Sequence, residues 1–232
     1  MGIKNLICQF TSQQKWMKKM RLDDYLSKFA ELKALYKIVK HDFSIREHMH
    51  HNWNHILRDL ARGVILGEKE GANVKIVLAS VLLHDIGRLY PAKGKDHHTL
   101  GAEVAPRHLA NSCFTKEETE EIIHCIWSHG PRGLKEPNTL EAKVIYDVNA
   151  LSCSCGNIGV ARVFNYFIAE EKLTIKQMLE IGSGKKGPRK NFCTETGRRL
   201  CEKSFTKAAK FWRELKEEEQ NIKEIVPEYT ED

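Results

Sequence analysis

The chain has 232 residues, 41% of them hydrophobic, so it is long enough and apolar enough to bury a core in one large domain. Its 37 basic and 31 acidic residues give a formal charge of +6, which suits phosphorylated partners, although a solvated mixed-charge surface is the simpler explanation. No apolar run approaches the roughly 20 residues of a membrane helix, and the N-terminal segment lacks a secretory pattern, so we expect a cytoplasmic protein without a membrane anchor.

Helical periodicity recurs along the chain, and no strand alternation lasts more than a few residues. The segments that we expect to be helical are 22–39, 51–67, 73–87, 101–109, 115–129, 140–151, 158–170 and 194–219. Asn73 is expected to cap the third of these, and Thr115 and Glu118 form a capping box that opens the fifth. The sequence therefore predicts an all-α protein.

No repeat of fixed period and no linker between two cores is evident, so we expect one domain over residues 1–232. Its core is expected at about 48–170, with an N-terminal helical segment at 1–47 and C-terminal helices at 171–232 packed on it. The loop 182–190, GSGKKGPRK, is basic and rich in glycine, so we expect it to be flexible and able to close over a substrate.

Histidine and aspartate residues gather at the expected helix ends. The chain has eleven histidines, and most lie in short clusters at 48–55, 82–87, 96–103 and 124–130, while an aspartate lies in the helix 144–151. Helix ends of a bundle can converge on one metal site. Imidazole and carboxylate ligands suit several divalent ions, and no pair of the seven cysteines has the spacing of a structural zinc site.

The dipeptide His84-Asp85 ends the most apolar helix of the chain. Burying two polar groups without partners costs roughly 1–3 kcal/mol each, so a partner is required. Two explanations are open at this point. Either the histidine donates a hydrogen bond to the aspartate, or both side chains bind a metal ion.

The ordered set His55, His84-Asp85 and Asp147 resembles the HD-domain phosphohydrolase superfamily, whose hallmark H…HD…D on a helical bundle binds a divalent metal. The resemblance extends from about His51 to Glu219 and is carried by HNWNHILRDL, LLHDIGR, HHTLGAEVA and EAKVIYDVNAL. TETGRRLCEKSF is similar to the last helix of small members that include nucleotide pyrophosphatases. The resemblance implies an HD-domain bundle with an N-terminal helical extension and a long C-terminal helix.

The same resemblance implies a metal-dependent phosphohydrolase that cleaves a phosphoester or phosphoanhydride of a nucleotide or small phosphorylated metabolite through metal-activated water. The metal ligands that it implies are His55, His84, Asp85 and Asp147. The ion would be Mn²⁺, Mg²⁺, Co²⁺, Ni²⁺, Fe²⁺ or Zn²⁺, which the sequence does not distinguish.

Further roles follow from the same comparison with the family. The residues implied in catalysis are Asp85, His97 and Arg58, and those implied in binding a second ion are His97 and His129. Asp85 would bridge two ions or orient the attacking water. The candidates to hold phosphate oxygens are Arg58, Lys93, Lys95 and Arg132.

The sequence also departs from the family pattern. Asn149 stands where many members carry a second aspartate, and Arg88 rather than an acid follows the His-Asp pair, so no separate carboxylate base is evident. The rival enzyme classes are a cyclic-nucleotide phosphodiesterase, a phosphatase without nucleotide preference and an HD oxygenase. The alternative outside enzymes is an HD-fold nucleotide sensor or nucleic-acid-associated module with little turnover. The substrate and the oligomeric state are not predicted.

Overall fold

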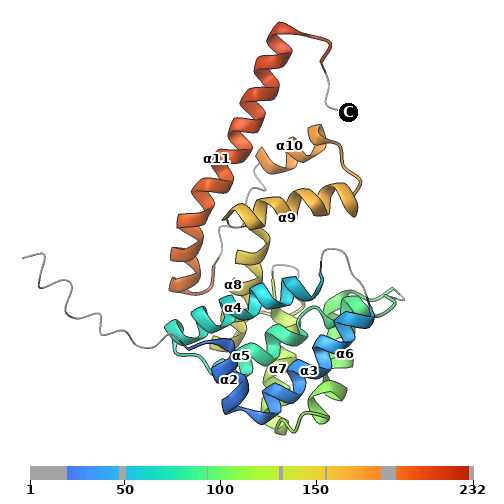
Figure 1. The fold of residues 1–232 in the computed structure, drawn as a ribbon, viewed down its shortest axis with the longest axis vertical. Helices are drawn as coiled ribbons and strands as arrows, with labels where there is room; N and C mark the ends of the chain where they lie inside the picture. The colour runs from blue at the N-terminus through green and yellow to red at the C-terminus, as the bar shows by residue number, and fades with distance from the viewer. Residues whose placement is uncertain are drawn as a thin grey trace, which may run out of the picture.

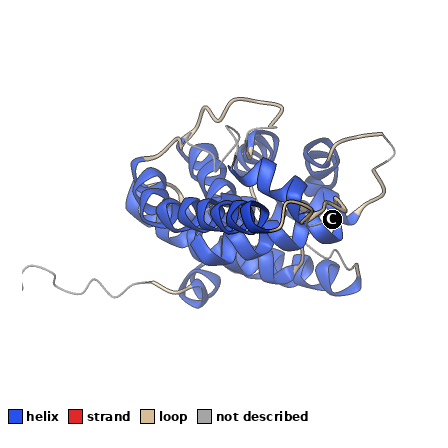
Figure 2. Cartoon of the chain, turned by 90° about the horizontal axis from the view of Figure 1, so that it is seen from above, coloured by secondary structure: helices blue, strands red, loops and turns tan. Residues whose placement is uncertain are grey.

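A computed structural model describes residues 20–46, 51–92, 94–130, 133–154, 156–183 and 192–229. These residues form helices and turns and no strand, which confirms the all-α class (Figure 2). The elements are α2 (Leu22–Lys28), α3 (Ala30–Ile45), α4 (Trp53–Glu70), α5 (Val74–Leu83), the 3₁₀ turn η1 (Ile86–Leu89), α6 (His97–Ala110), α7 (Lys116–Ser128), α8 (Leu140–Ser154), α9 (Gly156–Ala169), α10 (Ile175–Ser183) and α11 (Glu195–Ile225). Two expected phosphate ligands, Lys93 and Arg132, and most of the basic loop 182–190 lie outside the described residues.

Helix α5 lies at the centre of the bundle. Every residue from Ile76 to Leu83 is buried, and the helix packs against α3, α4, α7 and α8 (Figure 1). A helix that is apolar all round must be surrounded on all sides, which explains why this segment shows almost no amphipathic pattern. The residues that directly follow α5 are therefore placed in the interior, and these residues are His84 and Asp85.

Helices α9 to α11 follow α8 and continue from one side of this bundle. Helix α11 has 31 residues and extends away from it, with α9 and α10 packed along its side (Figure 1). The N-terminal part of α11 contacts α4 and α8, which ties the extension to the core. The expected core limits at 48 and 170 stay predictions. No helix among the described residues is both long enough and apolar enough to cross a membrane.

Three local predictions meet a direct test in the structure. The capping box of Thr115 and Glu118 at the start of α7 is confirmed. The single helix expected over 22–39 is wrong, because Phe29 is extended (φ −120°, ψ 104°) and packs its ring against the core, which separates α2 from α3. Asn73 is the N-cap residue of α5 as expected, but its side chain makes no capping hydrogen bond; its backbone N–H donates to Glu141. Helix α10 was not predicted.

Candidate metal centre

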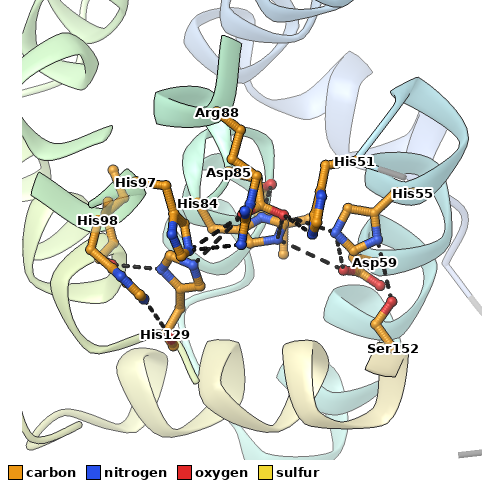
Figure 3. Close-up of polar contacts among 12 residues, drawn as sticks. His51, His55, Asp59, His84, Asp85, Arg88, His97, His98, His129 and Ser152 are labelled. Carbon is orange, nitrogen blue, oxygen red and sulfur yellow. Dashed lines mark hydrogen bonds and ion pairs between the residues drawn. The ribbon is translucent and has the colours of Figure 1, made fainter. Parts of the chain in front are cut away.

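Four segments that are distant in sequence meet at Asp85 (Figure 3). Each contributes polar side chains from a helix end or from the turn beside it. They are His51 and His55 at the start of α4, His84 and Asp85 after α5, His97 and His98 at the start of α6, and His129 at the end of α7. The expected convergence of histidine-bearing helix ends is therefore observed in the bundle.

A close approach of two backbones places η1 on α6. A Cβ atom added to Gly87 would lie 2.2 Å from the carbonyl oxygen of His97 and 2.6 Å from the backbone nitrogen of Gly101. Only a residue without a side chain fits this contact. The contact holds the start of α6, and with it His97, beside the Asp85 turn.

One oxygen of Asp85 faces the imidazoles of α4 and α5. Its Oδ2 atom lies 3.1 Å from Nε2 of His55 and 3.2 Å from Nε2 of His84. All three side chains are buried, with exposed fractions of 1 to 3%. These three donor atoms lie close enough together to surround a single metal ion. His51 lies at the edge of this group, with Nε2 3.8 Å from the same oxygen.

The imidazole of His84 is held by its other nitrogen. Its Nδ1–H donates to the carbonyl oxygen of Val81 at 2.8 Å, which directs Nε2 at the cluster. On the opposite side of His55, Ser152 Oγ lies 3.4 Å from Nδ1. Nε2 of His84 is buried, and Asp85 and Asp59 approach it at 3.2 and 3.9 Å through their Oδ2 atoms. Two imidazole nitrogens and carboxylate oxygens that converge in a buried space are ligands for a divalent cation, so the donor set fits a metal.

The charges around Asp85 keep its carboxyl group ionised, which is the form that binds a metal. Burial raises the pKa of this carboxyl, but the charges of His84, Arg88 and His51 outweigh burial and hold the pKa well below its usual range. Burial likewise lowers the pKa of His84, but Asp85 outweighs burial and raises it. In the metal-free protein the two residues therefore form an ion pair, and a bound cation would replace the imidazolium proton.

The other oxygen of Asp85 faces the histidines of α6 and α7. Nε2 of His97 lies 3.8 Å and Nε2 of His129 lies 3.9 Å from Oδ1. Burial lowers the pKa of His97 to about 3, and burial together with the charge of His84 lowers the pKa of His129 well below its usual range. Both rings are therefore neutral at pH 7. These two rings and His98 form a second group of donor atoms that could hold an ion.

Two features of this second group set it apart from the first. Both ring nitrogens of His98 already have partners, Asp96 at 3.2 Å and the carbonyl oxygen of His129 at 3.1 Å. The guanidinium of Arg88 lies between Asp85 and His97. Its Nε atom is 2.7 Å from Oδ1 of Asp85, and its Nη2 atom is 3.1 Å from Nε2 of His97. A second ion beside Oδ1 would require Arg88 to move away. Arg88 reaches this position because η1 directs its side chain toward Asp85, and the sequence did not indicate that direction.

The structure does not bring Asp147 into either group. Its buried carboxylate accepts hydrogen bonds from the backbone N–H of Cys193 at 2.8 Å, from the N–H of Thr194 at 2.7 Å and from the Thr194 hydroxyl at 2.6 Å. Burial raises its pKa, while these hydrogen bonds oppose that rise. Asp147 therefore fixes the start of α11 in this structure, and the ligand role carried over from the family is not supported by its position.

The expected phosphate ligands occupy different surroundings. Lys95 lies outside the site, in an exposed ion pair with Glu103 at 2.6 Å. Arg58 is half-buried on α4, and burial followed by the charge of Arg162 lowers its pKa. Arg62 adds a third guanidinium nearby, and its Nη1 donates to Ser152 at 3.1 Å. The Asp59 carboxylate offsets part of this positive charge, since Arg62 pairs with it at 2.7 Å.

Helix α6 depends on Asp96 for its start, which gives a first prediction. The Asp96 carboxylate accepts from the backbone N–H groups of His98 at 2.8 Å and Thr99 at 3.1 Å. Asp96→Ala should lower the free energy of unfolding by about 1 kcal/mol at pH 7. Burial raises the pKa of Asp96, but hydrogen bonds from Thr99 and His98 lower it to about 2, so this stabilisation is present at neutral pH and is lost as the pH falls from about 4 to 2.

Urea unfolding of wild type and Asp96→Ala at pH 7 and pH 2.5 measures the effect, with Asp96→Asn as the conservative control. An equal difference in unfolding free energy at both pH values would contradict the role of the carboxylate.

Comparison with known proteins identifies relatives of this chain in sequence and in fold. Residues 52–153 match the HD domain family. The chain is 32% identical over 120 residues to the protein YpgQ of Bacillus subtilis, which covers 50% of this chain and 57% of YpgQ. It is 30% identical over 136 residues to Ribonuclease Y of Desulforamulus reducens, which covers 59% of this chain and 24% of that enzyme. The chain thus spans little more than half of one relative and a quarter of the other.

Solved structures have the same fold over most of the chain. A predicted HD superfamily hydrolase from an uncultured Thermotogales bacterium gives a TM-score of 0.64 at 25% identity, covering 86% of this chain and 99% of that one. The structure of Bacillus subtilis YpgQ in complex with ADP gives a TM-score of 0.60 at 25% identity, covering 82% of this chain and 97% of that one. The similarity therefore includes helices outside the matched domain.

Proposed function

Because the chain belongs to the HD-domain superfamily, we propose that it is a metal-dependent phosphohydrolase that cleaves a phosphoester or phosphoanhydride bond of a nucleotide or another small phosphorylated metabolite. The observation that carries this proposal is the buried trio His55, His84 and Asp85, whose donor atoms converge on one point. Buried groups of this kind need a partner, and their ligand chemistry suits a divalent cation.

Each residue of the site has a distinct task in this mechanism. A bound divalent cation supplies Lewis acidity, which activates water and neutralises charge on phosphoryl oxygens. His55 and His84 would hold it through Nε2, and Asp85 through Oδ2. Arg88, fixed on Oδ1, is placed to stabilise the negative charge that develops on a phosphoryl group. His97 and His129 are neutral, so Arg88 supplies the positive charge on that side.

Two observations support a nucleotide as the substrate. YpgQ, with which this chain shares its fold, has been crystallised with ADP. Arg58 is crowded by Arg62 and Arg162, and the phosphate groups of a nucleotide would relieve their mutual repulsion. The likeness to Ribonuclease Y favours a second candidate, the hydrolysis of phosphodiester bonds in RNA.

We also propose the cytoplasm as the compartment, because the four cysteines described as free thiols suit a reducing environment.

The test is phosphate and pyrophosphate release from nucleoside mono-, di- and triphosphates by metal-stripped protein supplied with Mn²⁺, Co²⁺ or Mg²⁺. An RNA oligonucleotide is assayed in parallel, so that the two candidate substrates are compared under the same conditions. We expect turnover of at least one nucleotide that requires the cation and stops when a chelator is added. Cleavage of RNA alone would favour the second candidate. No turnover of either substrate by protein that holds metal would favour a binding module.

A further inference from the structure

A second carboxylate lies beside the two imidazoles of the metal centre. Asp59 is on α4, one helical turn after His55, and it is completely buried. Its Oδ2 atom lies 3.5 Å from Nε2 of His55 and 3.9 Å from Nε2 of His84 (Figure 3). These are the same two nitrogens that Asp85 approaches with its own Oδ2. Two carboxylate oxygens, one from α4 and one from the turn after α5, therefore share both imidazoles as neighbours.

This oxygen makes no hydrogen bond. Oδ2 of Asp59 and Nε2 of His84 are both among the buried side-chain atoms that have no hydrogen-bond partner in the described part of the chain. The nearest partners of the Asp59 oxygen are the two imidazole nitrogens at 3.5 and 3.9 Å, which is longer than a good hydrogen bond, and a buried carboxylate oxygen without one is expensive to maintain. Oδ1 of the same carboxylate is satisfied by Arg62, whose Nη1 donates to it at 2.7 Å. Arg62 thus fixes the carboxylate with its free oxygen facing the imidazoles.

We propose that Asp59 binds the catalytic cation through Oδ2, as the fourth protein ligand beside His55, His84 and Asp85. The inference rests on the proposed metal-dependent function and adds a ligand to it. With metal–ligand bonds of about 2.0–2.2 Å, neighbouring ligand atoms lie about 3.0–3.6 Å apart and opposite ones about 4 Å. The distances of 3.1 to 3.9 Å that join the two imidazole nitrogens to the two carboxylate oxygens fit these values. Asp59 lies outside the group whose donor atoms are all within 4.8 Å of one another, so its oxygen would have to move toward that of Asp85 when the cation binds.

The alternative fourth ligand, Asp147, is already engaged elsewhere. Its two oxygens accept three hydrogen bonds from Cys193 and Thr194, and a Cβ atom on Gly197 would lie 2.3 Å from its Oδ2. Withdrawing this carboxylate would leave donors at the start of α11 unsatisfied. Asp59 makes no comparable demand, because its Oδ2 makes no hydrogen bond that binding a cation would break.

The experiment measures cation binding rather than turnover. Metal-stripped wild type, Asp59→Asn and Asp147→Asn are titrated with Co²⁺ and Mn²⁺ by calorimetry, and the visible absorption of the Co²⁺ forms is recorded. We expect Asp59→Asn to weaken binding by at least about a hundredfold and to change the Co²⁺ absorption, because it removes a ligand from the ion. Asp147→Asn should keep both the affinity and the absorption, and should lower the melting temperature of the metal-free protein.

The outcomes separate this inference from the proposed function. A loss below about tenfold in Asp59→Asn, or a larger loss with unchanged Co²⁺ absorption, would overturn the ligand role, since residues that act through a ligand typically cost about 10–100-fold. Loss of binding in Asp147→Asn with its fold intact would restore the other carboxylate. Wild type that binds no cation would overturn the proposed function itself. Far-ultraviolet circular dichroism of each metal-free variant confirms that it is folded.

Discussion

Asp85→Asn is expected to reduce the metal-dependent kcat/KM by at least about a hundredfold and to abolish the stabilisation that a divalent cation gives to the wild type. Asp85 is the residue on which both groups of histidines converge. Its Oδ2 faces His55 and His84, and its Oδ1 holds Arg88. Asparagine has almost the same shape but no charge, so the variant keeps the packing and loses the attraction for a cation.

Two measurements check this prediction. Initial rates with the best nucleotide substrate and saturating Mn²⁺ give kcat/KM, and thermal melts with and without the cation give the stabilisation. The matched control is Asp42→Asn, which removes the carboxylate of another His-Asp pair, that of His108 at 2.6 Å, near the end of α6 opposite to His97. The control should keep the wild-type kcat/KM. Activity of Asp85→Asn within about tenfold of wild type would place the chemistry elsewhere in the molecule.

The order of the motifs along the sequence was enough to find the centre of the site. His55, His84 and Asp85 were expected to lie together, and the structure brings them together, because each stands at the end of a helix that local periodicity already defines. The all-α class follows from the same periodicity. The break at Phe29 is a different case, since a ring that packs on the core overrides a helical pattern that continues on both sides of it.

The sequence could not predict the roles that depend on the direction in which a side chain points. Asp147 has the same position on α8 whether it binds a metal or caps α11, and its partners Cys193 and Thr194 follow more than forty residues later. Arg88 reaches Asp85 only because η1 turns it inward. Asp59 had a readable signal, since it follows His55 by four residues on one helix face. That spacing is common on solvent-exposed helices, so it indicates a shared site only once both side chains are known to be buried.

Gly87→Ala is expected to be among the most destabilising single-methyl additions in the protein, lowering the free energy of unfolding by about 3 kcal/mol or more. A Cβ atom at this position would lie 2.2 Å from the carbonyl oxygen of His97 and 2.6 Å from the nitrogen of Gly101. Both obstacles are backbone atoms of α6, which cannot rotate away as a side chain would. The methyl group can be accommodated only if α6 moves off η1.

That displacement should also reach the site, because His97 starts α6 and Arg88 lies within η1. In protein that still folds, we expect kcat/KM to fall at least about tenfold, since His97 would no longer lie 3.1 Å from the Arg88 guanidinium and beside Asp85. Thermal melts should show the melting temperature falling by about 6–12 °C, from the usual 2–4 °C per kcal/mol for a chain of this size. Nucleotide hydrolysis of the folded fraction gives the second readout.

Gly71→Ala is the control that separates space from backbone conformation. Gly71 ends α4 with φ +74° and has no atom within 4 Å of an added Cβ, so alanine there costs about 1–2 kcal/mol of left-handed strain and leaves the site unchanged. At Gly87 the limit is a steric clash with the backbone of α6. Gly87→Ala should therefore lose more stability than Gly71→Ala, and it should also lose activity, which the control keeps. Equal melting temperatures for the two variants, with wild-type kcat/KM in both, would mean that α6 does not approach η1 this closely in solution. The placement of His97 beside Asp85 would then be wrong as well.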